Sequence, residues 1–398
     1  MNRITLNTIF QVFARALEFV AGLLINTWLA REWGSHFFGQ IGSLSSLVGI
    51  CSFLCTFGSE VLLIRTIARE RERARHYLLN GLSLVSKLSL FAALVLFALG
   101  TWLFPPAFFP VLALAGLQMF LGSVCLMVQA TFYAFERMEF DSLASSIDRG
   151  CWLFVGAWLA TRPPSLLALF AGICLCKGLK FLVGGVLFIR FILPLTEPAV
   201  VRWKEQGRIL KQAIPFGLDL LFSTIYVSVD VLLLAHWSGP SEAGYYRAAS
   251  MLIVPFTILA VSLNNAFLPS MSVNARSNPA ELRRVCSLSA RLVLLAAFPI
   301  CLFTSLFAES IIFLLYGTSY APAVLLLRFL SLVIPLRFLN NSLSTSLLAC
   351  DRQNDQMKCE GLAAGFNILC NALTIPLRQE DAQTSSQGLP EGDGQGIA

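Results

Sequence analysis

The sequence predicts an all-α polytopic membrane protein with about eleven transmembrane helices. The chain of 398 residues is 56% hydrophobic and only 13% charged, with a mean hydropathy of +0.72. A soluble domain is about 45–50% apolar and about 25% charged, so a water-soluble protein of this size could not bury so much apolar surface. Only helices or a closed barrel satisfy the backbone inside lipid, and the apolar runs are far longer than the roughly ten-residue strands of a barrel.

Eleven runs reach the roughly 20 mostly apolar residues that one crossing needs. Six of them precede the longest connector, which contains two prolines and four basic residues, and five follow it. In chain order the predicted spans are residues 4–30, 40–64, 78–104, 111–135, 142–160, 165–192, 212–236, 245–269, 288–316, 323–349 and 361–376. The last span is short. Beyond it, residues 377–398 form a polar, Gly-rich tail that we expect to be disordered.

The basic residues of the loops predict the orientation of the chain. If the N-terminus lies in the cytoplasm, the outer loops receive only Arg31, Arg162, Arg247 and Arg378. The other basic loop residues, including the cluster at positions 65–75, then fall on the cytoplasmic side. Cytoplasmic loops carry an excess of Lys and Arg, so this bias supports both a cytoplasmic N-terminus and the number of spans.

An internal repeat relates the two halves of the chain. Gly34 and Gly39, which follow the first span, reappear 205 positions later as Gly239 and Gly244, and a Leu-Ala pair precedes both copies. An even number of spans separates the copies, so the halves have the same orientation. The repeat is therefore parallel, with its axis along the membrane normal.

A second shared feature strengthens the repeat. The acidic-Arg pair Glu136-Arg137 returns 215 positions later as Asp351-Arg352, again at a junction between two spans. We therefore predict an N-terminal lobe of six helices, a cytoplasmic linker, a C-terminal lobe of about five helices and the polar tail. Their boundaries are residues 1–193, 194–211, 212–376 and 377–398.

Two spans carry a stripe of polar residues along one helix face. In the first span the stripe consists of Gln11, Arg15, Glu18, Gly22 and Asn26. In the seventh span it consists of Asp219, Ser223, Tyr226 and Asp230. A charge at the bilayer centre costs about 2.5–3.5 kcal/mol, so these faces must turn towards a partner charge or a hydrated cavity. The alternative to a cavity is a structural ion pair, because Arg15 and Glu18 are three residues apart and could neutralise each other.

Basic residues inside other spans could bind an anionic headgroup. Lys177 and Lys180 are three residues apart and could instead snorkel to an interface. Asp148 and Arg149 are adjacent and point about 100° apart on a helix. Arginine suits phosphate because its guanidinium is a planar fork of donors. The predicted substrate cavity comprises Arg15, Glu18, Asn26, Arg149, Lys177, Asp219, Tyr226, Asp230, Arg328 and Arg337.

Several function classes are disfavoured by the sequence. It contains no G-x-x-x-x-G-K-[ST] phosphate loop, no G-x-S-x-G elbow and no aqueous domain with paired carboxylates, so we expect neither an enzyme nor a cofactor. Most of the eleven cysteines lie in apolar runs, and the three histidines have no Cys or second His nearby, so we expect packing rather than a metal site. The basic residues lack interleaved aromatics, which disfavours nucleic acid as a partner.

Several short motifs occur in a characteristic order along residues 4–376. They are TWLAREWGSHFFGQ from Thr27, TFGSE from Thr56 with Arg65 and Arg69 after it, PFGLD from Pro215, GYYRAA from Gly244, and Leu268-Pro269. Each motif alone is degenerate. Together they resemble the polysaccharide flippases of the multidrug/oligosaccharidyl-lipid/polysaccharide exporter superfamily.

The resemblance implies two six-helix lobes arranged in a V and transport by alternating access in the bacterial inner membrane. The implied cargo is an undecaprenyl-pyrophosphate-linked oligosaccharide, the repeat unit of O-antigen lipopolysaccharide or of an exopolysaccharide. The implied partners are this lipid-linked oligosaccharide, membrane lipids and other proteins of polysaccharide assembly. The family continues past Ile375-Pro376 into a further span, whereas this chain turns polar there. We therefore expect a truncated or frame-shifted C-terminal lobe.

Three alternatives stay open. A multidrug or cation antiporter of the same superfamily would place a carboxylate pair centrally, and Asp219 with Asp230 could serve. A lipid II flippase has a similar architecture but a longer chain. A membrane enzyme, such as an O-antigen polymerase or ligase, resembles chains with one large external loop, and this sequence has none. The cations inside the spans favour an anionic lipid over a cationic drug.

Overall fold

The computed structural model describes residues 3–198, 201 and 203–387, and every regular element within those ranges is a helix. The N-terminal half holds α1 (Arg3–Thr56), α2 (Ser59–Arg69), α3 (Ala74–Leu103), α4 (Phe109–Ala134), α5 (Met138–Ala160) and α6 (Leu166–Leu187). The C-terminal half holds α7 (Trp203–Trp237), α8 (Pro240–Met251), α9 (Val254–Ser277), α10 (Pro279–Leu306), α11 (Ala308–Tyr316), α12 (Ala321–Ser331), α13 (Val333–Ala349) and α14 (Gln353–Gln387). Short helical turns join them: η1 (Arg71–Arg73), η2 (Pro106–Phe108), η3 (Phe188–Ile192), η4 (Leu193–Leu195) and η5 (Thr318–Tyr320). The predicted all-α fold is confirmed.

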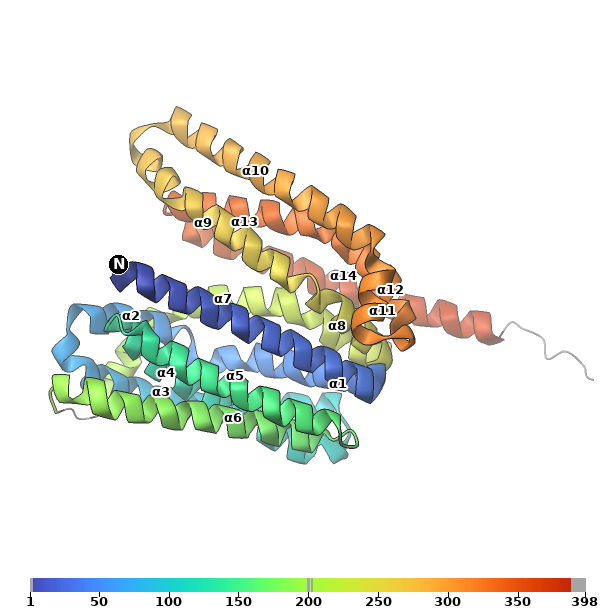
Figure 1. Ribbon diagram of the computed structural model, residues 1–398, viewed down its shortest axis with the longest axis horizontal. Coiled ribbons are helices and arrows are strands. Elements are labelled where there is room, and N and C mark those ends of the chain that lie inside the picture. Colours follow the sequence, from blue (N-terminus) through green and yellow to red (C-terminus); the bar gives the residue numbers. More distant parts are fainter. Residues whose placement is uncertain (1–2, 199–200, 202, 388–398) are drawn as a thin grey trace, which may run out of the picture.

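The helices form two groups that meet at one end of the molecule (Figure 1). Helices α3 to α6 run beside α1, whereas α9, α10 and α13 diverge from it towards the end where the N-terminus lies. The groups converge where α8, α11 and α12 lie. The largest hydrophobic cluster of the N-terminal half lies around α1, α3, α4, α5 and α6, and a second large cluster fills the C-terminal half. Ala30 and Phe38 of α1 belong to the second cluster. Helix α1 therefore ties the halves together.

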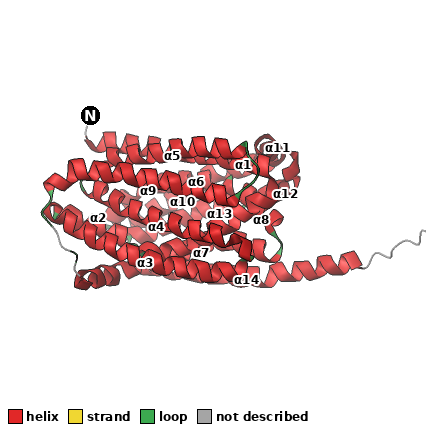
Figure 2. Ribbon diagram, turned by 90° about the horizontal axis from the view of Figure 1, so that it is seen from below, coloured by secondary structure: helices red, strands yellow, loops and turns green. Residues whose placement is uncertain are grey.

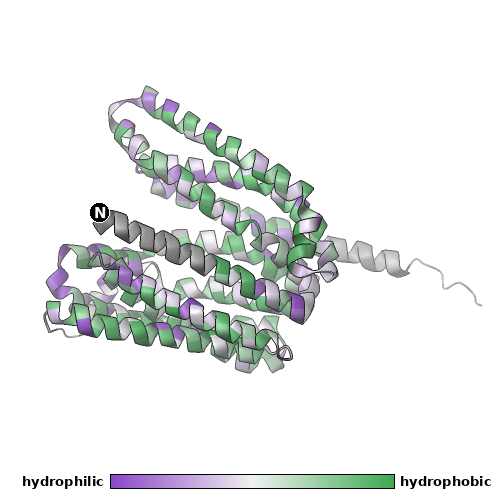
Figure 3. Cartoon of the chain, viewed as in Figure 1, coloured by the Kyte–Doolittle hydropathy of each residue, from purple (hydrophilic) through white to green (hydrophobic). Residues whose placement is uncertain are grey.

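Eight helical stretches in the described chain are long and apolar enough to cross a membrane. They cover every predicted span except those of α5 and α14; α5 carries Asp141, Asp148 and Arg149. Large apolar side chains such as Phe154 and Leu314 are exposed, as lipid-facing residues must be. Hydrophilic residues instead gather at helix ends, for example in the turn between α9 and α10 (Figure 3). The chain is a multi-pass membrane protein.

Breaks inside predicted spans are the main correction to the sequence analysis. The predicted span 40–64 is divided between α1 and α2, because Phe57 and Gly58 have φ angles of 48° and 74° and end the first helix. Gly217 of α7 packs against this break so closely that a Cβ there would lie 2.7 Å from the Phe57 carbonyl oxygen. The periodicity of apolar residues continues across the break, so sequence reasoning did not detect it.

Three predicted spans of the C-terminal half are also divided. Residues 245–269 form α8 and α9, residues 288–316 form α10 and α11, and residues 323–349 form α12 and α13. Pro255 and Pro335 lie in the first turns of α9 and α13. Proline lacks an N–H and its ring clashes with the carbonyl four residues earlier, which explains two of these breaks.

The halves share the backbone features that the repeat predicts. Gly34 and Gly239 have φ angles of 75° and 94°, values that favour glycine. Gly34 divides the long helix α1 into two segments, and Gly239 separates α7 from α8. Glu136 and Asp351 have φ angles of 59° and 58°. After each of them, the N–H of the next residue bonds to a carbonyl five residues back at 2.9 Å, a Schellman-type helix end.

The halves touch through a reciprocal pair of glycines. A Cβ on Gly39 of α1 would overlap the carbonyl oxygen of Pro240, and a Cβ on Gly244 of α8 would overlap that of Ser35. These positions are the repeat equivalents of one another. The helices α1 and α8 can approach this closely only because both residues lack a side chain.

The first part of the tail that the sequence analysis expected to be disordered is helical. Helix α14 continues to Gln387 and extends beyond the bundle (Figure 2). Residues 377–387 contain Glu, Gln, Arg and Ala, which favour helix, and no Gly or Pro occurs before Gly388. Residues 388–398 lie outside the described part of the chain.

Candidate substrate-binding site

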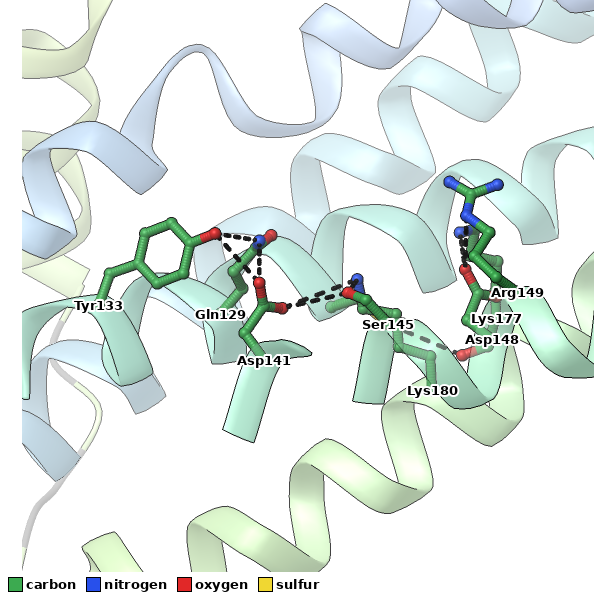
Figure 4. Close-up of polar contacts among 9 residues, drawn as sticks. Gln129, Tyr133, Asp141, Ser145, Asp148, Arg149, Lys177 and Lys180 are labelled. Carbon is green, nitrogen blue, oxygen red and sulfur yellow. Dashed lines mark hydrogen bonds and ion pairs between the residues drawn. The ribbon is translucent and has the colours of Figure 1, made fainter. Parts of the chain in front are cut away.

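A network of polar side chains connects α4, α5 and α6 inside the N-terminal half (Figure 4). Asp141, Ser145 and Asp148 are spaced by four and three residues on α5, so they share the face that packs on α6. The Nζ atom of Lys177 on α6 donates to Asp148 Oδ2 at 2.7 Å. Asp148 is 4% exposed, so Lys177 neutralises a buried carboxylate.

The second carboxylate of the network has more partners. Asp141 Oδ2 accepts hydrogen bonds from Gln129 at 2.7 Å and from Tyr133 at 3.0 Å, both on α4. Lys180 Nζ lies 3.8 Å from Asp141 Oδ1 and donates to Ser145 Oγ at 2.9 Å. Each carboxylate thus has its own lysine.

Arg149 of α5 is the third cation of the network, and its Nε atom is 4.0 Å from Asp148 Oδ2, the oxygen that Lys177 also contacts. A Cβ on Gly156 of α5 would strike Ile25 of α1, so this face of α5 packs on α1. Arg149 lies seven residues, or two helical turns, before Gly156 on α5, and Glu18 lies seven residues before Ile25 on α1. Arg149 is therefore on the α1-facing side of the lobe.

A second polar cluster surrounds Asp230 in the C-terminal half. Its Oδ2 atom accepts a hydrogen bond from Tyr246 of α8 at 2.8 Å, and its Oδ1 atom accepts one from Asn371 of α14 at 2.8 Å. Arg337 of α13 and Tyr226, one turn before Asp230, are electrostatic neighbours of Tyr246. Three of the predicted cavity residues, Tyr226, Asp230 and Arg337, therefore lie together.

Other predicted cavity residues are placed differently. Arg15, Glu18 and Asp219 lie on α1 and α7, but their side chains are outside the described part of the structure. Asn26 is half-buried, and its amide donates to the carbonyl oxygen of Gly22 at 2.7 Å.

Arg328 contacts neither cluster within the described residues. It shares a face of α12 with Leu325, Phe329 and Leu332, which are exposed by 59%, 63% and 59%. Such a face suits lipid, and a long Arg side chain can reach the headgroup region from there. The structure therefore separates Arg328 from the other predicted cavity residues.

Sequence reasoning missed several partners of these clusters. Gln129, Tyr133, Tyr246 and Asn371 were not recognised, because neutral polar residues occur in many helices and only their contacts make them distinctive. The four-three spacing of Asp141, Ser145 and Asp148, opposite two lysines three residues apart, was a signal that could have identified the network.

The two clusters offer groups that can bind a polar or anionic ligand. Both contain hydrogen-bond donors, and the N-terminal cluster contains the guanidinium of Arg149, a group that binds phosphate in a forked geometry. The residues that the structure describes contain no group of three or more His, Cys, Asp or Glu side chains that could hold a metal ion.

Comparison with known proteins gives consistent results. A family model described as "Polysaccharide biosynthesis protein" matches residues 4–275, and the MatE model matches residues 215–373. A Shigella dysenteriae protein named "Putative O-antigen transporter" is 21% identical over 271 residues, which are 67% of each chain.

Solved structures of transporters share the fold. The lipid II flippase MurJ in an inward closed conformation superposes with a TM-score of 0.67 at 16% identity, covering 94% of this chain and 82% of that one. An exporter superfamily transporter from Pyrococcus furiosus gives a TM-score of 0.64 at 13% identity, covering 94% and 89%. An inward-facing multidrug resistance transporter of the MATE family gives 0.62 at 14% identity, covering 90% and 95%.

Proposed function

This chain belongs to the polysaccharide biosynthesis protein family, a family of transporters in the multidrug/oligosaccharidyl-lipid/polysaccharide exporter superfamily, and we propose that it flips an undecaprenyl-pyrophosphate-linked oligosaccharide across the bacterial inner membrane. The cargo is the repeat unit of an O-antigen or exopolysaccharide. It enters from the cytoplasm, where it is assembled, and leaves on the outer side.

The observation that carries this proposal is the set of three cations, Lys177, Lys180 and Arg149, that the α4–α6 network gathers in the N-terminal half. Arg149 lies on the side of the network that faces α1, and its guanidinium presents the planar fork of donors that suits a phosphate group. The pyrophosphate of a lipid-linked sugar offers acceptors for that fork, and neutral polar groups such as Asn26 and Tyr226 would bind its sugar hydroxyls.

The arrangement of the halves supports transport by alternating access. The halves converge at the end where Gly39 meets Gly244 and diverge at the other end. With the predicted cytoplasmic N-terminus, the diverging end faces the cytoplasm. The cargo would enter between the halves from that side and leave when the glycine contact opens.

A second candidate is a multidrug or cation antiporter, which the MatE match over residues 215–373 favours. Asp230 accepts hydrogen bonds from the neutral donors of Tyr246 and Asn371, and its carboxylate would be the group that binds a cation. The two lysines and the arginine of the N-terminal network argue against a cationic drug as the cargo of the whole protein.

The test is reconstitution of the full chain into liposomes that carry one radiolabelled candidate cargo each. The cargoes are undecaprenyl-pyrophosphate-oligosaccharide and lipid II, and ethidium efflux is measured in parallel. We expect protein-dependent exposure of the oligosaccharide to an external lectin and little movement of the other two. Movement of ethidium or lipid II alone would replace the proposal with the corresponding alternative.

A further inference from the structure

Three buried polar groups lie close together where α1, α8 and α11 meet: Thr27 Oγ1, Arg247 Nε and Tyr316 OH. Arg247 Nε has no acceptor among the described residues, and the hydroxyls of Thr27 and Tyr316 face each other. Phe38 lies between two of them. Its ring centre is 5.2 Å from the guanidinium carbon of Arg247 and 6.3 Å from the ring centre of Tyr316.

The sequence placed Arg247 in an outer loop, and the structure corrects this. Arg247 lies on α8 and packs into the space left by Gly42 of α1, where a Cβ would be 2.9 Å from Arg247 Cδ. Gly42 is the repeat equivalent of Arg247. Where the two halves cross, the second copy of the repeat therefore contributes the guanidinium of Arg247, and the first copy contributes Gly42, which leaves space for it.

No carboxylate within the described residues forms an ion pair with Arg247. The face of Phe38 attracts the cation but accepts no hydrogen bond in the plane of the guanidinium. A buried cation normally has a counter-charge, because removing it from water is costly. Its surroundings here supply donors instead.

Tyr316 and Tyr320 of this junction differ in the partners of their hydroxyl groups. Tyr320 OH donates to the carbonyl oxygen of Ala30 at 2.9 Å. Tyr316 is 1% exposed and its ring centre is 5.2 Å from that of Tyr320, and its hydroxyl faces the hydroxyl of Thr27. Two hydroxyls that bond to each other use only one of their two hydrogens, so one hydrogen of this pair remains for a further partner.

We propose that Thr27, Arg247 and Tyr316 form a binding site for one compact anion at the junction of the two halves. The site presents one positive charge and a pair of hydroxyls, one of whose hydrogens remains free when the two hydroxyls bond to each other. A water molecule would satisfy the hydroxyls but would leave the guanidinium charge uncompensated. An anion satisfies both, and its chemistry is that of chloride or of a phosphate group.

The site is distinct from the α4–α6 network and does not depend on the identity of the cargo. It lies at the end where α1 meets α8, so an anion bound there contacts both halves. The anion thus stabilises the conformation in which Gly39 and Gly244 touch.

The test measures the thermal unfolding midpoint of the purified full chain against the concentration of sodium chloride or sodium pyrophosphate. Sodium gluconate keeps the ionic strength constant. We expect a saturable rise of the midpoint with at least one of the two anions in the wild-type protein. If chloride gives the rise, the ligand is a free halide; if pyrophosphate alone gives it, the ligand is a phosphate group.

The variants identify the site. Arg247→Gln should abolish the anion dependence, and Tyr316→Phe should raise the half-saturating concentration roughly tenfold. Arg162→Gln, which removes an arginine stacked 5.4 Å over Trp158, and Tyr320→Phe are matched controls that should keep the wild-type dependence. Tyr316→Phe keeps its ring, so it remains informative if Arg247→Gln does not fold. Absence of a saturable response in the wild type, or the same response in both Arg247→Gln and Tyr316→Phe, would overturn the proposal.

Discussion

Single ionised side chains inside the helices of this protein differ mainly in what neutralises them. Asp148 is 4% exposed and is bonded to Lys177 at 2.7 Å, whereas Arg71 and Glu136 form a pair whose side chains are 48% and 68% exposed. Removing one partner of a buried pair leaves an uncompensated charge, but an exposed charge is solvated by water.

Lys177→Ala should therefore destabilise the protein by about 2 kcal/mol, because the carboxylate of Asp148 loses its charge-assisted hydrogen bond and keeps only the more distant Arg149. The free energy of unfolding in SDS is the measurement. Asp148→Asn combined with Lys177→Gln should recover most of the loss. Arg71→Ala is the exposed control and should cost less than about 1 kcal/mol. Equal losses in Lys177→Ala and Arg71→Ala would contradict the buried position of the first pair.

Arg149 and Arg328 test which intramembrane arginines take part in transport. Both were predicted to line the cavity, but only Arg149 belongs to a polar cluster, whereas Arg328 shares an apolar face of α12. We expect Arg149→Ala to lower the rate of oligosaccharide flipping roughly tenfold or more, through loss of charge-assisted hydrogen bonds to phosphate. Arg328→Ala should flip at close to the wild-type rate. The reverse order of rates would reject the assignment of Arg149.

Among the helices, α1 and α8 make the closest approach between the two halves. Their backbones touch at Gly39 and Gly244, and each glycine faces a carbonyl of the other helix. Equivalent positions of the repeat meet there, so the contact has approximate two-fold symmetry. A side chain at either glycine would force the helices apart.

Gly39→Ala and Gly244→Ala should each destabilise the protein by roughly 1–3 kcal/mol, the usual cost of overpacking a close contact. The midpoint of SDS unfolding reports this loss. Gly22→Ala is the control, because a Cβ at Gly22 of α1 meets nothing within 4 Å. It should be neutral or should stabilise the helix by up to about 1 kcal/mol. Similar stability in all three variants would show that α1 and α8 are not packed through their backbones.

For the whole molecule, exposed residues fall into two environments, lipid and water. Tyr226 of α7 is 40% exposed and lies beside the Asp230 cluster, whereas Leu336 of α13 is 65% exposed. If the halves enclose a hydrated chamber that opens to the cytoplasm, the first residue faces water and the second faces lipid.

Cysteine labelling can separate these environments. In a background without native cysteines, Tyr226→Cys should react with a membrane-impermeant maleimide in inside-out vesicles, because a thiol in water ionises and reacts. Leu336→Cys should stay unlabelled although it is more exposed. Labelling of Tyr226→Cys only in right-side-out cells would show that the predicted orientation is reversed. Labelling at neither site would contradict the hydrated chamber between the halves.

Much of the fold follows from the sequence alone. Lipid replaces water around the helices, so each crossing must be a long apolar run, and every predicted span coincides with one or more helices. The glycines at 34 and 239 and the acidic-Arg turns follow from local backbone requirements, which explains why the repeat was readable. The charges of Asp230, Arg149 and Lys177 were identified as lying inside the spans because they interrupt apolar runs.

Only the tertiary structure decided which of those charges are compensated and where the helices break. Whether Lys177 is a free cation depends on Asp148, which lies on another helix, and no local pattern encodes that contact. The break at Phe57 and the position of Arg247 beside Gly42 depend on how α7 and α8 pack on α1. Hydropathy sets which residues leave water, but the close packing of distant helices sets which polar groups they meet.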